Sequence, residues 1–95
     1  MKIKSDFTIQ PVGSFYTAVA VGETSKTFHA MMRLNETGAF LWKKMAERDC
    51  TEAELVDAIL AEYEAERAVV ERDVHAIVMQ LATAGVFVEG TEPKA

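Results

Sequence analysis

The stretch LNETGAFLW, residues 34–42, divides the sequence into two halves with different periodicity. Before it, apolar and polar residues alternate as in β-strands, and after it apolar residues recur every three or four positions as in α-helices. Asn35 carries a side-chain oxygen that can accept a hydrogen bond from the first turn of a helix, so it predicts an N-cap. The helix is predicted to run from this cap to about Ala46. Its core-facing residues have helical spacing: Gly38, Leu41, Trp42 and Met45.

The first half predicts three antiparallel strands. Residues 6–12 alternate, and Pro11 within them must end the strand or lie at a sheet edge, because proline cannot donate to a ladder. The Gly13-Ser14 pair predicts a tight turn into a second strand at residues 15–21. A third strand is predicted at residues 27–34, with Phe28, Ala30, Met32 and Leu34 on one face and His29, Met31 and Arg33 on the other.

The second half predicts two more helices. Thr51 and Glu54 have the spacing of a capping box, and Cys50 and Leu55 flank it as a hydrophobic staple, so we expect the cysteine to pack rather than react. The helix that follows is predicted to bury Leu55, Val56, Ile59, Leu60 and Tyr63. The last helix is predicted to bury Val70, Val74, Ile77, Val78 and Leu81 and to end at Gly85.

Periodicity alone leaves open whether these two helices are one, because no glycine or proline occurs from Glu52 to Ala84. We favour a break near residues 64–66, since a single rod of ~50 Å would keep so short a chain from folding back on its core. An unbroken rod would imply a swapped dimer. The predicted fold is therefore α+β, a three-stranded antiparallel sheet followed by three helices. We expect one domain over residues 1–90 and a flexible tail at residues 91–95.

Composition and charge narrow the class of protein. A chain of 95 residues that is 49% hydrophobic and 26% charged is typical of one folded domain. The net charge is −5, and ten carboxylates lie between Glu47 and Asp73. So acidic a surface would repel a phosphate backbone, which argues against DNA or RNA binding. The apolar runs are shorter than the ~20 residues of a membrane-spanning helix. No secretion signal is visible, and a single cysteine cannot form an internal disulfide, so we expect a cytoplasmic protein.

No catalytic or metal-binding pattern is visible. His29 and His75 lie on different predicted elements, and neither belongs to a spacing such as HExxH or CxxC. A zinc site built from these histidines and Cys50 is the weaker alternative. The five glycines form no phosphate-binding loop. The sequence therefore predicts a protein that is not an enzyme and that carries no cofactor or metal ion.

Four motifs together resemble the PqqD-like family: LNETGAFLW at residues 34–42, TxxELV at residues 51–56, ILxxY at residues 59–63 and DVxxIVxxLxxxG at residues 73–85. The resemblance runs from about Phe7 to Val88. Members of this family are peptide chaperones, also called recognition elements for the precursors of ribosomally synthesised and post-translationally modified peptides (RiPPs). The resemblance implies a winged-helix-like domain and supports a break between the last two helices. Ala30 departs from the family pattern, which often has glycine there.

The resemblance also implies how a partner is bound. The leader segment of a precursor peptide would add as a strand to the edge formed by the third strand, with its side chains in a groove beside the last helix. Transferred by position, the candidate peptide-binding residues are Lys26, Phe28, His29, Ala30, Met31, Met32, Arg33, Asp73, Ile77, Gln80, Leu81 and Ala84. Lys26 and Arg33 are expected to attract leader carboxylates. Asp73 stands where the family usually has an acid, so its expected role is either structure or recognition.

The resemblance implies a separate modifying enzyme, commonly a radical S-adenosylmethionine (SAM) enzyme, to which the leader is presented. Pyrroloquinoline quinone biosynthesis is one pathway among several. Two alternatives stay open. A winged-helix DNA-binding regulator would need a basic recognition helix where this sequence is acidic. A homodimer could instead pair through the edge strand.

Overall fold

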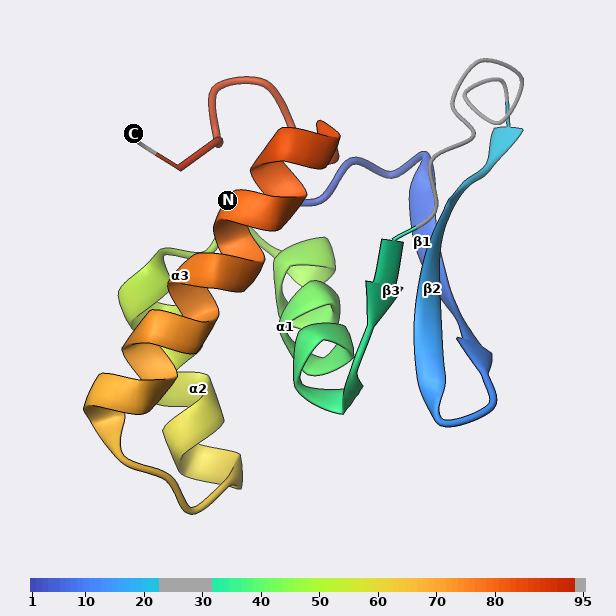
Figure 1. Cartoon of the computed structure of the whole chain (residues 1–95). Coiled ribbons are helices and arrows are strands. Elements are labelled where there is room, and N and C mark those ends of the chain that lie inside the picture. Colours follow the sequence, from blue (N-terminus) through green and yellow to red (C-terminus); the bar gives the residue numbers. More distant parts are fainter. Residues whose placement is uncertain (23–31, 94–95) are drawn as a thin grey trace.

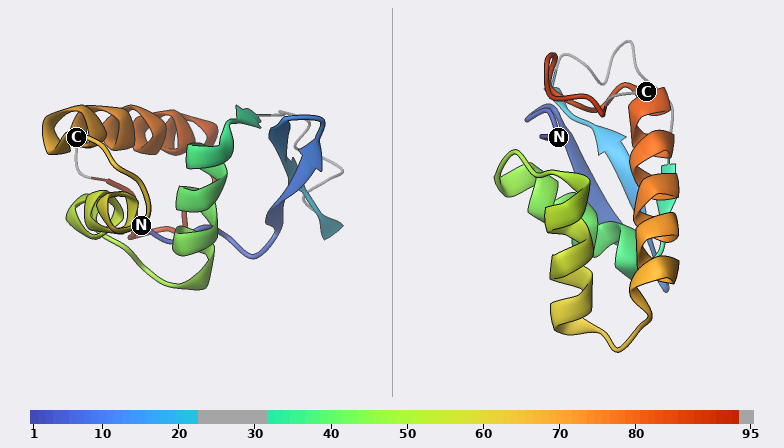
Figure 2. Two further views of the ribbon diagram at one scale, coloured as in Figure 1. Left: turned by 90° about the horizontal axis from the view of Figure 1, so that it is seen from below. Right: turned by 90° about the vertical axis from the view of Figure 1, so that its left-hand side faces the viewer.

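The computed structural model describes residues 1–22 and 32–93, and they form a three-stranded antiparallel sheet followed by three helices, as predicted (Figure 1). The elements are β1 (Phe7–Val12), β2 (Phe15–Ala20), β3 (Met32–Leu34), α1 (Glu36–Glu47), α2 (Glu52–Glu62) and α3 (Arg67–Ala84). The helix α1 lies between the α2–α3 pair and the sheet, and the β1–β2 hairpin extends away from the helices (Figures 1 and 2). The helices therefore form one side of the molecule and the hairpin the other.

The sheet has the order β1-β2-β3, with both neighbouring pairs antiparallel. Val12 pairs with Phe15 across a two-residue turn, in which Gly13 takes the left-handed conformation at φ 63° that such turns require. Pro11 lies in β1, which is an edge strand, so its missing N–H leaves no gap inside the sheet. At the opposite edge, β3 pairs with β2 and, among the described residues, with no other strand.

The helix ends follow the side chains that cap them. The Asn35 Oδ1 atom accepts a hydrogen bond of 2.8 Å from the Gly38 N–H at the start of α1. At α2, Thr51 and Glu54 form both bonds of the predicted capping box, at 3.1 and 2.9 Å. The chain breaks between α2 and α3 near residues 64–66, and α3 ends at Gly85, whose φ of 76° is left-handed. These four sequence predictions are confirmed.

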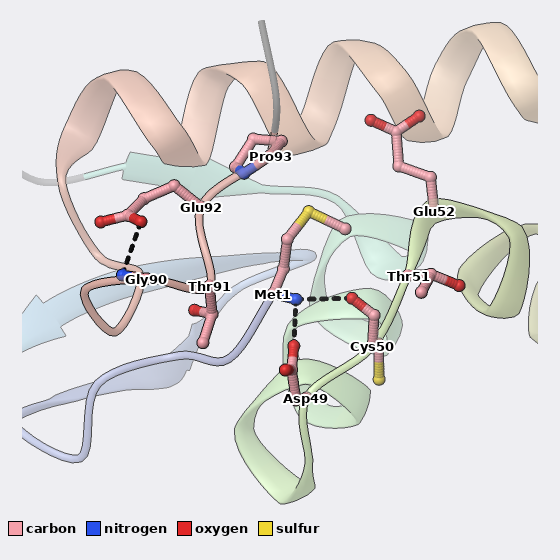
Figure 3. A pocket seen from close by; sticks show the side chains of 9 residues that line it. All are labelled: Met1, Asp49, Cys50, Thr51, Glu52, Gly90, Thr91, Glu92 and Pro93. Carbon is pink, nitrogen blue, oxygen red and sulfur yellow. Dashed lines mark hydrogen bonds and ion pairs between the residues drawn. The ribbon is translucent and has the colours of Figure 1, made fainter.

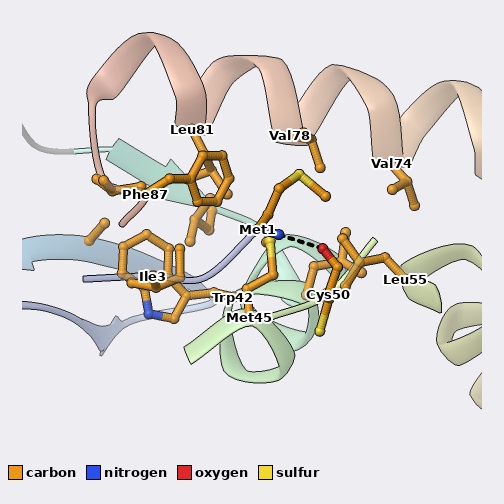
Figure 4. Close-up of a cluster of buried hydrophobic side chains, with 14 of the residues drawn as sticks. Met1, Ile3, Trp42, Met45, Cys50, Leu55, Val74, Val78, Leu81 and Phe87 are labelled. Atoms are coloured by element: carbon orange, nitrogen blue, oxygen red, sulfur yellow. Dashed lines mark hydrogen bonds between the residues drawn. The ribbon is translucent and has the colours of Figure 1, made fainter. Parts of the chain in front are cut away.

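The core lies between the three helices and the amino-terminal segment (Figure 4). Its best-buried side chains come from every helix: Leu41, Met45, Leu55, Val74, Val78 and Leu81. The sequence analysis did not place Met1 or Ile3 there, yet both are buried. Ile3 forms an isolated antiparallel bridge with Phe87, and its N–H donates to the Met45 carbonyl oxygen at 3.0 Å. Residues from both ends of the described chain thus close the core.

Tyr63 corrects one sequence prediction, because its side chain is 37% exposed rather than buried. It is the C-cap of α2, with extended backbone angles of φ −128° and ψ 147°, so its side chain no longer follows the buried face of that helix. Its ring instead meets Phe40 edge-on, with ring centroids 5.9 Å apart and an interplanar angle of 85°. In the described ranges, no helix has the length and apolarity needed to cross a membrane.

Candidate functional site

The outer edge of β3 is open in the part of the chain that the structure describes. Leu34 is buried and Met32 is half-buried against the core, whereas Arg33 between them is exposed, so these residues alternate as predicted. The backbone of β3 pairs with β2 on one side, and no described backbone or side-chain group bonds to its other side. The strand is therefore anchored by its side chains, and no described residue pairs with the N–H and C=O groups along its outer side.

A cavity of about 270 Å³ lies between this strand and α3. We call it the β3–α3 groove, and it is lined by Phe15, Arg33, Leu34, Asn35, Gly38, Ile77 and Gln80. Ile77 and Gln80 stand three positions apart on α3 and so share one face of the helix. The groove places an apolar side chain and an amide opposite the open strand edge.

Arg33 and Phe15 form the rim of the groove on the sheet side. The guanidinium carbon of Arg33 lies 5.1 Å from the centroid of the Phe15 ring, which is a cation–π geometry. Phe15 is 44% exposed. This contact holds a positive charge at the mouth of the groove.

Gly38 sets how closely α1 approaches β3. A Cβ atom added at this glycine would lie 3.3 Å from both Cβ and Cδ2 of Leu34 and 3.4 Å from Asn35 Oδ1. Those first two distances are tighter than ordinary van der Waals contact. Gly38 was predicted to face the core. It also lets α1 pack closely against β3 at the floor of the groove.

The remaining predicted residues of α3 lie elsewhere. Asp73 is exposed and lines two neighbouring cavities. Leu81 is fully buried, because it continues the core stripe of Val74 and Val78, and Ala84 is half-buried against the core. Leu81 thus lies behind the groove, in the core, and not on its surface.

Five predicted residues, Lys26, Phe28, His29, Ala30 and Met31, lie outside the described residues, and their role stays a prediction. The sequence analysis missed Phe15, Leu34, Asn35 and Gly38 as groove residues. Three of these belong to the LNETG motif, which was interpreted as a helix start and a core face. The motif in fact joins the strand edge to the helix, so its residues reach the groove as well as the core.

A larger cavity, of about 500 Å³, lies beside the α1–α2 turn (Figure 3). Its polar groups already have partners: the Met1 amino group donates to Asp49 and to the Cys50 carbonyl oxygen, and the Gly90 N–H donates to Glu92. Burial raises the pKa of the Cys50 thiol, which disfavours the reactive thiolate. Nowhere in the described chain do three possible metal ligands gather. These observations give the cavity no chemistry of its own.

The fold and the groove define a winged-helix-like domain with one sheet edge that no described residue covers. Residues 18–86 match the model of the family described as Coenzyme PQQ synthesis protein D (PqqD), and the chain belongs to this family. The matched residues include the end of β2 and all of β3 and α3, and with them every residue that lines the groove except Phe15.

Two solved structures are similar to the chain. One, described as TbiB1 in complex with the TbiA(beta) leader peptide, is 28% identical with a TM-score of 0.69, over 95% of this chain and 96% of that one. The other, a lasso peptide synthetase B1 complexed with the leader peptide, is 21% identical with a TM-score of 0.64, over 88% and 92% of the two chains, and supports the fold alone. No curated protein matches the sequence.

Proposed function

We propose that this protein binds the leader segment of a RiPP precursor peptide by strand addition to β3 and presents it to a separate modifying enzyme. The observation that carries the proposal is the open edge of β3 directly beside the β3–α3 groove. The PqqD family match and the similarity to TbiB1, a protein described in complex with a leader peptide, support the same assignment.

The proposed binding mode uses two kinds of contact. Hydrogen bonds to the free backbone edge supply affinity that does not depend on the leader sequence, and side chains on one face of the added strand supply selectivity. Every second leader residue would point toward the groove, because side chains alternate along a strand. Ile77 would receive an apolar side chain, and Arg33 at the rim would receive an acidic one.

We further propose that the modifying enzyme is a radical SAM maturase and that the protein itself performs no chemistry. Binding in the cytoplasm, where precursor peptides are made, agrees with a single reduced and buried cysteine. A DNA-binding role has no support, since α2 begins with Glu52 and Glu54 and carries no basic residue in its last turn. A homodimer that pairs through β3 would compete with the leader for the same edge.

Fluorescence anisotropy with the labelled leader of a precursor peptide, sought among the neighbouring genes, would test the proposal. We expect Ile77→Asp to weaken binding about tenfold or more, because a charge replaces an apolar contact in the groove. Met79→Asp is the matched control, since Met79 lies about 200° around the helix axis from Ile77. Circular dichroism would verify that both variants fold. Equal binding by wild type and Ile77→Asp would contradict the proposed site.

A further inference from the structure

We propose that the leader footprint continues past β3, along α3, to an apolar cavity at the corner between α2 and α3. The leader segment that reaches this corner would carry an apolar side chain for the cavity and a basic side chain beside Asp73. The inference rests on the proposed leader-binding function and adds a second recognition point to it.

The path to the corner is a series of adjoining cavities. Asn35 and Ile77 line both the β3–α3 groove and a second cavity of about 350 Å³. Thr37 and Asp73 line both that second cavity and a third of about 180 Å³ at the corner. From Gln80 to Val69 the path follows about 17 Å of helix, which an extended peptide covers with about five residues.

The corner cavity is apolar and exposed. Its lining residues are Thr37, Ile59, Tyr63, Ala65, Val69, Val70, Asp73 and Val74. Val69 and Tyr63 are 39% and 37% exposed, so two large apolar side chains at its rim face water. Covering them with an apolar side chain would be favourable, at about 25 cal/mol for each Å² removed from water.

The charges beside the cavity select a basic partner. Asp73 is exposed, and its carboxylate forms no hydrogen bond or ion pair with any described residue. The adjacent Arg72 points about 100° away around the helix axis, and Arg67 is already paired with Asp57 at 2.7 Å. The Asp73 carboxylate is thus available, at the junction of two cavities, to a lysine or arginine of the visiting peptide.

The direction of the leader follows from the sheet. Both described strand pairs are antiparallel, and we take the added strand to continue that pattern. An antiparallel strand beside β3 has its amino-terminal side at Leu34, next to Asn35, where the path begins. The corner would therefore bind leader residues that precede the strand-paired stretch.

A double-mutant cycle would test the inference. The two probes are the leader encoded beside the gene and the same peptide without the residues that precede its β3-paired stretch, as mapped by amide shifts. In the wild type we expect the truncation to weaken binding about tenfold, as for one well-buried apolar side chain. Val69→Asp should weaken binding of the full leader by a similar factor and leave the truncated leader unchanged. Ala68→Asp adds the same charge outside the cavity and should bind both peptides as the wild type does.

Asp73→Asn tests separately whether the Asp73 carboxylate attracts a basic side chain of the leader. It should weaken binding of the full leader a few-fold at low salt and flatten the salt dependence, with no effect on the truncated leader. If Val69→Asp leaves binding of the full leader unchanged while Ile77→Asp weakens it, the corner site is refuted and leader binding in the groove stands. If truncation costs the same factor in Val69→Asp as in the wild type, the corner site is also refuted. If the wild type binds no leader, both proposals fail.

Discussion

Replacing Asn35 with alanine removes the side-chain acceptor at the junction of β3 and α1. The lost interaction is the 2.8 Å hydrogen bond from the Gly38 N–H to Asn35 Oδ1. Asn35 is exposed, so the substitution leaves no cavity in the core, and the cost is that of an N-cap alone. Such a loss is typically about 1 kcal/mol, which lowers the melting temperature of a domain of this size by about 4–8 °C.

Urea unfolding followed by circular dichroism would measure this change. Asn35→Ser keeps a side-chain oxygen at the cap and should recover most of the loss. Thr51→Ala removes the corresponding acceptor at the start of α2, outside the groove, and should destabilise the domain by a similar amount while leaving leader affinity unchanged. Asn35→Ala, in contrast, should also weaken leader binding, because Asn35 itself lines the proposed groove.

Two results would refute this reasoning. An Asn35→Ala protein as stable as the wild type would show that water replaces the cap without cost. Equal destabilisation by Asn35→Ala and Asn35→Ser would show that Asn35 acts through something other than its side-chain acceptor.

Three further predictions concern the core and the pH dependence of stability. Met45→Ala, at a fully buried site, should destabilise the domain by about 2–5 kcal/mol in urea unfolding, and a smaller loss would mean that the core collapses around it. Cys50 should be alkylated much more slowly in the folded than in the urea-unfolded protein, as read by mass spectrometry, because burial raises the pKa of its thiol; equal rates would contradict that burial. The Thr51 N–H and then Arg48 hold the pKa of Glu54 below its ordinary 4.5, so this carboxylate stabilises the fold above that pH and less as the pH falls below it. The wild type should therefore lose more melting temperature than Glu54→Gln between about pH 5 and pH 3, and parallel losses would argue against the shift.

Local sequence signals predicted most of the fold because each acts over a few residues. Asn35, Thr51 and Gly85 mark helix ends through hydrogen bonds or a backbone angle that depend on near neighbours. Pro11 restricts its strand to an edge for the same kind of reason. The buried stripe of α3 also follows from helical spacing alone.

These local signals could not predict contacts between residues far apart in the sequence. Met1 and Ile3 are buried because residues 2–4 meet residues 86–88 and the end of α1, a contact across nearly the whole chain. Tyr63 has the spacing of a buried residue, but the chain turns at that position and exposes it. At the candidate site, Ile77 and Gln80 could be chosen by helical phase, whereas Phe15 reaches the groove only because β2 pairs with β3 and so brings it beside Arg33. No periodicity within one element carries that information.

Because Gly38 has no side chain, this one position sets how closely α1 can approach β3. An alanine there would improve the intrinsic helix propensity of α1, yet it would push Leu34 outward by a few tenths of an ångström. Because Leu34 belongs to β3 and lines the β3–α3 groove, that displacement would shift β3 relative to α3 and change the width of the groove. Under the proposed function, the width of the β3–α3 groove, and with it the set of peptides that fit, would therefore depend on the residue at position 38.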